Sequence, residues 1–186
     1  MVNRTSAIVT NYKTTSKKID EKITLTFKEI KYLDIKQIAA WPSTIESVGL
    51  KLANIINTSN APGFNQSLSI KDKHILRIEP LKWWVIGGGN IEIESNEGTN
   101  VDLSHAFTSI EIKGENVKEF LNRHLPIDLR DQSFPVNSIT SSAIHHVSVK
   151  IWRTDFGYRI FIPRGFALSI WEIFLETASQ FGYEVL

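Results

Sequence analysis

The sequence predicts an α+β fold of two small domains, each a sheet with helices, and the second of them ferredoxin-like. The first observation is that apolar and polar residues alternate in several short segments, which is typical of half-buried strands. The second is that the segments 45–56 and 167–178 carry apolar residues at helical spacing. The third is the element order of the second half, which is strand, helix, strand, strand, helix, strand. This βαββαβ order is that of a ferredoxin-like split βαβ unit.

The chain begins with a polar segment, 1–21, that lacks any apolar period. Such a segment buries too little apolar surface to offset the entropy lost on ordering. We therefore expect a flexible arm that is either frayed or ordered only against a partner. The first sheet is expected directly after it, because Ile23, Leu25 and Phe27 alternate with polar residues.

The middle of the chain contains a helix start, a strand region and a run of glycines. Ser43–Glu46 matches a capping box, in which the serine hydroxyl and the glutamate carboxylate bind free backbone amides of a first helical turn. Residues 75–86 are apolar enough for a strand region, and Gly87–Gly89 follows at once. Consecutive glycines after a strand favour a flexible joint. The sequence thus predicts an N-terminal α+β domain over 22–89 and a C-terminal ferredoxin-like domain over 90–186.

In the C-terminal domain each predicted element has its own pattern. Alternation marks the strands, a stripe of apolar residues marks each helix, and Thr154–Gly157 has the composition of a hairpin turn. The expected elements are strand 107–112, helix 115–125, a strand through 147–151, strand 158–162, helix 167–178 and a short strand 183–186.

Composition excludes several classes of function. The 186 residues are 42% hydrophobic, which is enough for a core without covalent cross-links. Lys and Arg total 21 against 20 Asp and Glu, so no broad basic field favours nucleic acid. No cysteine is present, which excludes disulfides, thiolate nucleophiles and iron–sulfur clusters. Because neither a secretory signal nor a membrane span is evident, we expect a cytoplasmic protein that binds neither nucleic acid nor membrane.

The sequence offers no recognisable catalytic or metal site. None of the five histidines has the i, i+4 partner on a helix that a zinc motif requires. The serine-hydrolase motif Gly-x-Ser-x-Gly is absent, and Gly87–Gly89 lacks the lysine of a phosphate-binding loop. One alternative stays open, in which Arg130, Arg153 and Arg164 hold a carboxylate substrate in a small enzyme.

Trp83 and Trp84 are consecutive on a predicted strand. Neighbouring residues of a strand point to opposite faces, so both faces need cover. If this chain covers only one of them, the other indole marks a contact surface for a second protein. We therefore take the pair as candidate interface residues.

The second half also resembles a known family. Asp102-Leu103-Ser104-His105, the strand into Gly114, the helix to His124, Leu125–Leu129, Phe134-Pro135 and the run Tyr158–Ala167 together resemble the gamma subunit of heterotetrameric sarcosine oxidase. The resemblance extends from Asp102 to Gly182, while the first half agrees only in size and strand order. That family is related in fold to the folate-binding aminomethyltransferases.

The resemblance implies a role in a larger enzyme. It implies a bacterial complex with alpha, beta and delta subunits that oxidatively demethylates sarcosine to glycine. FAD, FMN, NAD and tetrahydrofolate would belong to the larger subunits and zinc to the small one, with no cofactor in this chain. The expected role of the gamma subunit is structural, and the isolated chain is not expected to be catalytic.

Asp102 is the one candidate that the resemblance offers for a folate site. The aminomethyltransferases use an acid in an Asp-Asp-containing segment near the pterin, and no Asp-Asp pair occurs in this chain. Asp102 could bond a pterin-like ring, but an Asx turn with Ser104 is the simpler interpretation. The alternative function is a stand-alone tetrahydrofolate-binding protein of the aminomethyltransferase-like kind.

Overall fold

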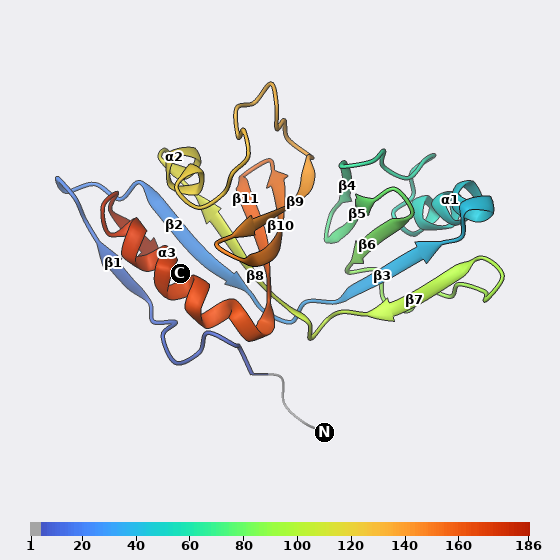
Figure 1. The fold of residues 1–186 in the computed structure, drawn as a ribbon, viewed down its shortest axis with the longest axis horizontal. Coiled ribbons are helices and arrows are strands. Elements are labelled where there is room, and N and C mark those ends of the chain that lie inside the picture. Colours follow the sequence, from blue (N-terminus) through green and yellow to red (C-terminus); the bar gives the residue numbers. More distant parts are fainter. Residues whose placement is uncertain (1–4) are drawn as a thin grey trace. The chain divides into compact units, whose positions relative to one another are not determined.

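The structure, a computed structural model, describes residues 5–186 and divides the chain into two compact units. The first unit combines the residues up to Lys31 with Ala106–Val136 and Ser141–Leu186. The second consists of Tyr32–His105 and Asn137–Thr140. Each unit contains one sheet and its helices, as Figure 1 shows. The predicted α+β class with two sheet-plus-helix parts is confirmed.

The predicted boundary at Gly87–Gly89 is wrong, because strand pairing joins segments that are far apart in sequence. β2 (Leu25–Ile30) pairs with β8 (Phe107–Lys113) in the first unit, and β3 (Ile35–Ala40) pairs with β7 (Gly98–Asp102) in the second. The glycines therefore lie inside the second unit. Local composition shows a turn there but carries no information on these pairings.

The seven-stranded sheet of the first unit is a ferredoxin-like sheet with additions. Its order is β1-β12-β2-β8-β11-β10-β9. β8, β10, β11 and β12 hold the positions of a split βαβ unit, and β2 is inserted between β12 and β8, parallel to the former and antiparallel to the latter. The remaining strands are β1 (Thr15–Lys17), β9 (Ile139–Ile144), β10 (Val147–Thr154), β11 (Gly157–Pro163) and β12 (Tyr183–Val185).

Helices α2 (Val117–Asn122) and α3 (Ala167–Ala178) supply the apolar side chains that cover one face of this sheet. α3 follows a short 3-10 turn, Arg164–Phe166, and its bounds match the predicted helix. The helical residues that pack against the strands include Phe120, Leu121, Ile170, Trp171 and Phe174, all at most 1% exposed.

The segment up to Glu21 is not a free arm where the structure describes it. Ile8 is completely buried, Tyr12 packs on Trp171 at 5.5 Å between ring centroids, and β1 pairs antiparallel with β12. The prediction of a flexible arm over 1–21 is therefore wrong from residue 5 onward, and residues 1–4 lie outside the described part. A few apolar side chains are enough to hold this segment in place, because the C-terminal helix and strand pack and pair with it.

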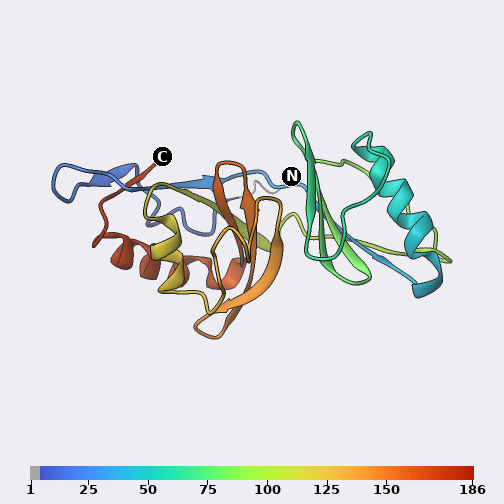
Figure 2. The ribbon, with the colours of Figure 1, turned by 90° about the horizontal axis from the view of Figure 1, so that it is seen from above.

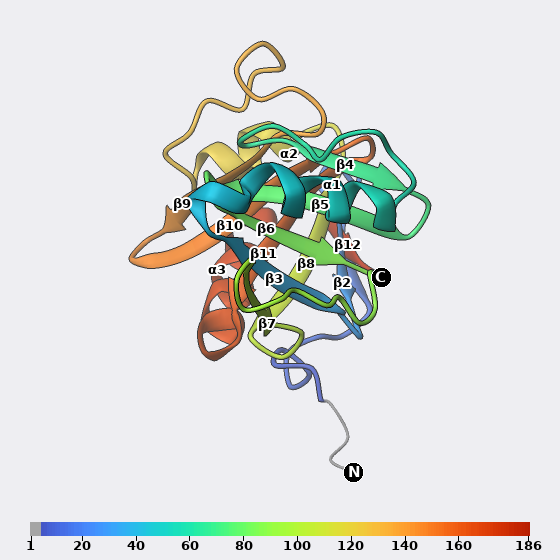
Figure 3. The ribbon, with the colours of Figure 1, turned by 90° about the vertical axis from the view of Figure 1, so that its right-hand side faces the viewer.

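The second unit is a five-stranded antiparallel sheet covered by one helix. The order is β4-β5-β6-β3-β7, with β4 (Ser67–Ile70), β5 (Lys73–Glu79) and β6 (Lys82–Ile86) forming a meander. α1 (Ile45–Ile55) lies along one face, as Figures 2 and 3 show. Its residues Val48 and Leu52, with Ile56 directly after the helix, complete a core with the sheet residues Ile38, Ile75, Trp83 and Val85.

The start of α1 agrees with the prediction in position but not in capping chemistry. A 3-10 turn, Pro42–Thr44, precedes the helix, and no side chain caps its first amides. The Thr44 hydroxyl instead donates to the carbonyl oxygens of Trp41 and Glu97. The helix is held by its buried face, which contributes more to stability than a cap does.

Among residues 5–186, no helix is long and apolar enough to cross a membrane.

Candidate functional site

Both members of the Trp83–Trp84 pair are buried in this chain, each 1% exposed. Trp83 belongs to the core under α1, and the Arg77 guanidinium lies over its ring at 5.1 Å. Trp84, on the opposite face of β6, donates its indole N–H to Gln37 Oε1 at 3.2 Å. Neither indole offers an exposed aromatic surface, so the prediction that this pair forms an interface is wrong. The sequence pattern cannot tell cover within the chain from cover by a partner.

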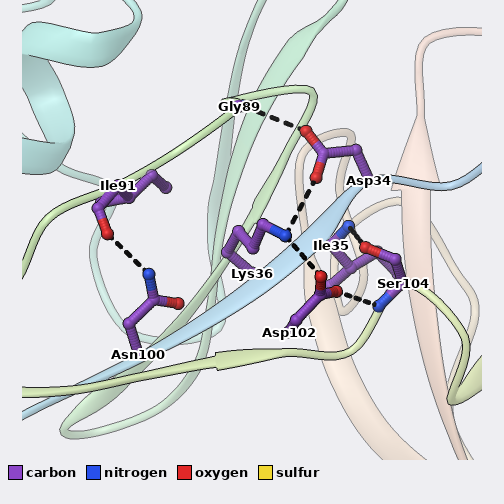
Figure 4. A network of polar contacts seen from close by, with 8 residues as sticks. All are labelled: Asp34, Ile35, Lys36, Gly89, Ile91, Asn100, Asp102 and Ser104. Carbon is purple, nitrogen blue, oxygen red and sulfur yellow. Dashed lines mark hydrogen bonds and ion pairs between the residues drawn. The ribbon is translucent and has the colours of Figure 1, made fainter.

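Asp102 ends β7 and lies in a network of polar contacts, shown in Figure 4. Its Oδ2 accepts a hydrogen bond from Lys36 Nζ at 2.6 Å, and its Oδ1 accepts one from the backbone N–H of Ser104 at 2.8 Å. The second bond is the Asx turn that the sequence suggests. Both carboxylate oxygens are thus engaged within the chain.

Lys36, on β3, lies between two carboxylates. Its Nζ is 2.6 Å from Asp102 Oδ2 and 3.7 Å from Asp34 Oδ1. The hydrogen bond to Asp102 is the largest cause that raises the pKa of Lys36. In return, the hydrogen bonds from Lys36 and Ser104 hold the pKa of Asp102 well below its usual range. Lys36 and Asp102 are therefore both charged at neutral pH, and neither is available as a free base or a free acid.

Further bonds of this network join the ends of β3 and β7 to a loop. The Ile35 N–H donates to Ser104 Oγ at 3.1 Å, and the Gly89 N–H donates to Asp34 Oδ2 at 3.0 Å. Asn100 Nδ2 donates to the Ile91 carbonyl oxygen at 2.6 Å (Figure 4). Since every bond joins groups of this chain, the network fixes two strands and the glycine loop. Its chemistry is that of a structural clamp.

Replacing Asp102 with asparagine is expected to weaken this clamp in a pH-dependent way. A carboxyl group whose folded-state pKa is depressed stabilises above its unfolded pKa of about 4, and this contribution is lost as pH falls through the folded-state pKa. The free energy of unfolding should fall by about 0.5–1 kcal/mol at pH 7, because the pair is partly exposed, and the difference should shrink below pH 4. Urea unfolding between pH 2 and 7 measures it.

Asp155→Asn is the matched control, since Asp155 forms no ion pair within residues 5–186. A difference between wild type and Asp102→Asn that stayed constant down to pH 2 would contradict the ionic clamp.

The partners of Asp102 were not found by sequence reasoning. Asp34 and Lys36 stand in the alternating stretch Leu33-Asp34-Ile35-Lys36, where Leu33 and Ile35 are buried. That alternation places Asp34 and Lys36 on the same side of the chain where β3 begins, and this feature of the sequence could have predicted that the two charges lie close together. The pairing of β3 with β7, which brings Asp102 opposite Lys36, is not encoded locally.

The three arginines proposed for a carboxylate substrate have separate partners. Arg130 forms a bidentate pair with Asp128, Arg153 pairs with Asp131 at 3.4 Å, and Arg164 donates to the carbonyl oxygen of Thr5. The cavity that Arg153 lines contains neither of the other two. The structure does not bring them together as one anion site.

The histidines form no metal centre in the part of the chain that is described, where no group of three metal-ligating side chains occurs. His124 is the most perturbed of them. Burial against Phe120 and Phe174 lowers its pKa to about 4, with smaller contributions from His145 and Arg123, so it is neutral at pH 7.

Comparison with known proteins finds solved structures with a fold similar to that of this chain. No protein-family model matches the sequence, and no curated protein matches it. A chain of the heterotetrameric sarcosine oxidase from Corynebacterium sp. U-96 has a similar structure, with a TM-score of 0.71 and 18% identity over 84% of this chain and 85% of that chain.

Aminomethyltransferase T of the glycine cleavage system from Bartonella henselae is also similar, with a TM-score of 0.63 and 12% identity. The match covers 89% of this chain and 48% of that one, so this chain spans about half of the transferase. At these identities the comparisons establish the fold, which is that shared by a sarcosine oxidase chain and an aminomethyltransferase.

Proposed function

We propose that this chain is a non-catalytic gamma subunit of a heterotetrameric sarcosine oxidase, with a role in assembly. The observation that carries the proposal is the mutual coverage with the sarcosine oxidase chain, 84% of one and 85% of the other. The aligned part is most of each chain, so the fold of this chain corresponds to most of one chain of such a complex.

The surroundings of Asp102 support the non-catalytic part, in a fold whose match spans about half of the aminomethyltransferase. Asp102, the residue considered for a pterin, has both carboxylate oxygens bound by Lys36 and Ser104. Its carboxylate is therefore not free to bind a folate ring. In this proposal, the flavins, the nicotinamide dinucleotide, tetrahydrofolate and zinc belong to the alpha, beta and delta subunits.

Co-expression with the three other subunits tests the proposal. We expect one complex of four different chains by size-exclusion chromatography with mass measurement, and a loss of assembly when this chain is left out. A matched preparation with a sarcosine oxidase gamma subunit of similar fold serves as the positive control. If the other three subunits assemble and oxidise sarcosine equally well without this chain, the proposal fails.

The alternative is a stand-alone tetrahydrofolate-binding protein, favoured by the similarity to aminomethyltransferase T over 89% of this chain. Calorimetric titration of the isolated chain with tetrahydrofolate separates the two functions. Binding at micromolar strength that Asp102→Asn weakens would support the alternative. The assembly role predicts no heat of binding.

A further inference from the structure

The described N-terminal segment up to the end of β1, residues 5–17, docks on the first unit as a strap. Ile8 is completely buried in the core of that unit, and the Trp171 indole N–H on α3 donates to the Asn11 carbonyl oxygen at 3.2 Å. β1 then pairs antiparallel with β12 at the edge of the seven-stranded sheet (Figure 1). The strap is therefore held near both of its ends, on one unit.

A two-residue turn, Asp20-Glu21, lies in the linker 18–24 between the strap and β2. Two backbone hydrogen bonds close it, from the Ile19 N–H to the Lys22 carbonyl oxygen at 3.1 Å and back at 2.9 Å. The angle φ is 49° at Asp20 and 62° at Glu21. Positive φ at both central residues defines a type I′ turn, for which Asn-Gly is a preferred sequence. Aspartate tolerates this conformation but glutamate adopts it rarely, so the turn is strained.

The docked strap also covers a carboxylate that lacks part of its hydrogen bonding. Glu29, on β2, is 8% exposed. Its Oε1 accepts a hydrogen bond from the Ser6 hydroxyl at 2.7 Å, and the Tyr12 hydroxyl accepts one from the Glu29 backbone N–H at 2.9 Å. Its Oε2 is buried and has no hydrogen-bond partner within residues 5–186. A buried acceptor without a donor is unfavourable, and water can hydrate this oxygen once the strap lifts.

The closed state of the strap is thus opposed by two local terms that opening relieves. The strain at Glu21 ends when the linker extends, because its backbone can then leave the left-handed region. The strap is retained by the burial of Ile8 and by the contact of Tyr12 with Trp171. An element held by few apolar side chains and opposed by a strained hinge has a low free energy of local opening.

A second copy of the chain offers the strap an identical docking surface. The extended linker reaches about 20 Å, and on the second copy the strap can form the same contacts that it leaves on the first. The two-residue turn is not needed in that arrangement, so its strain is not incurred again. Exchange of an identical element between copies has a low free-energy cost, and a short strained hinge favours it.

We propose that the strap opens at Asp20-Glu21 and exchanges with the strap of a second copy of this chain. The product is a dimer in which each strap lies on the other copy. The partner is a second copy because the surface fits this strap, and every copy carries both. The inference goes beyond the proposed function and does not depend on it, since it concerns the isolated chain.

Hydrogen exchange in the isolated full chain tests the opening. The Tyr12 backbone N–H, which donates to the Ile8 carbonyl oxygen, reports on the strap. The double variant Asp20→Asn/Glu21→Gly suits a type I′ turn, so exchange at Tyr12 should slow by about threefold or more. Glu21→Gln is the matched control, because it removes the charge but keeps a strained side chain, and it should exchange as the wild type does. Equal rates in all three chains would indicate fraying from the N-terminus and would overturn opening at the turn.

Mixing of two preparations tests the exchange itself. Light and isotopically heavy chains are mixed at high protein concentration, and native mass spectrometry measures the dimers that contain one of each. We expect mixed dimers for the wild type and for Glu21→Gln, and a several-fold smaller fraction for Asp20→Asn/Glu21→Gly. Absence of mixed dimers in the wild type, or equal fractions in all three chains, overturns the proposal. Both experiments use this chain alone, so their failure is distinct from a failure to assemble with other subunits.

Discussion

Replacing Trp171 with alanine is expected to lower the free energy of unfolding by about 3–5 kcal/mol, as for other large aromatic residues in cores. Trp171 is completely buried on α3, and its ring packs against Phe27 at 5.7 Å and Tyr12 at 5.5 Å between centroids. Its indole Nε1–H donates to the Asn11 carbonyl oxygen at 3.2 Å. The substitution therefore removes core volume and one bond that fastens the N-terminal segment.

Two measurements check this expectation. Urea unfolding gives the loss of stability, and hydrogen exchange at the backbone amide of Tyr12, which bonds to the Ile8 carbonyl oxygen, reports release of the N-terminal segment. Trp41→Ala is the control, because that indole is 44% exposed and bonds only at its edge, to the Ser95 carbonyl oxygen. We expect a loss of at most about 1 kcal/mol there. Equal losses in the two variants would contradict the role given to Trp171.

The elements that could be predicted from sequence are those with a local cause. The apolar stripe over 167–178 predicted a helix because its residues share one face, and α3 has those bounds. The turn Thr154–Gly157 joins β10 to β11 as its composition indicates. In the network around Asp102, the bond to Ser104 could be anticipated because the two residues are neighbours in the chain.

What could not be predicted depends on pairing at long range. β1 pairs with β12 although the two are at opposite ends of the chain, so the polar composition of 1–21 suggested an arm where a strand exists. Lys36 meets Asp102 only because β3 and β7 are neighbours, although the two residues are 66 positions apart in sequence. Alternation of polar and apolar residues shows which face of a strand a side chain occupies. Which strand lies next to it depends on the topology of the sheet.

Gly114→Ala is expected to destabilise the chain by about 2–4 kcal/mol, because it combines a strained backbone with a steric clash. Gly114 follows β8 and has a φ of 127°, a conformation that residues with a side chain rarely adopt. A Cβ atom there would lie 1.9 Å from the Thr24 carbonyl oxygen and 3.1 Å from Leu25 Cα. Both neighbours are backbone, so no side-chain rotation can relieve the contact.

The clash falls where β2 begins to pair with β8, so relief requires the two strands to separate at Thr26 and Lys113. The expected result is a lower melting temperature together with faster hydrogen exchange along β2. Gly165→Ala is the control with the same chemical change, since its added methyl meets no atom within 4 Å, and its stability should stay within about 0.5 kcal/mol of wild type. A Gly114→Ala variant as stable as this control would mean that β2 and β8 do not approach each other at this glycine, and the central pairing of the seven-stranded sheet would have to be reassigned.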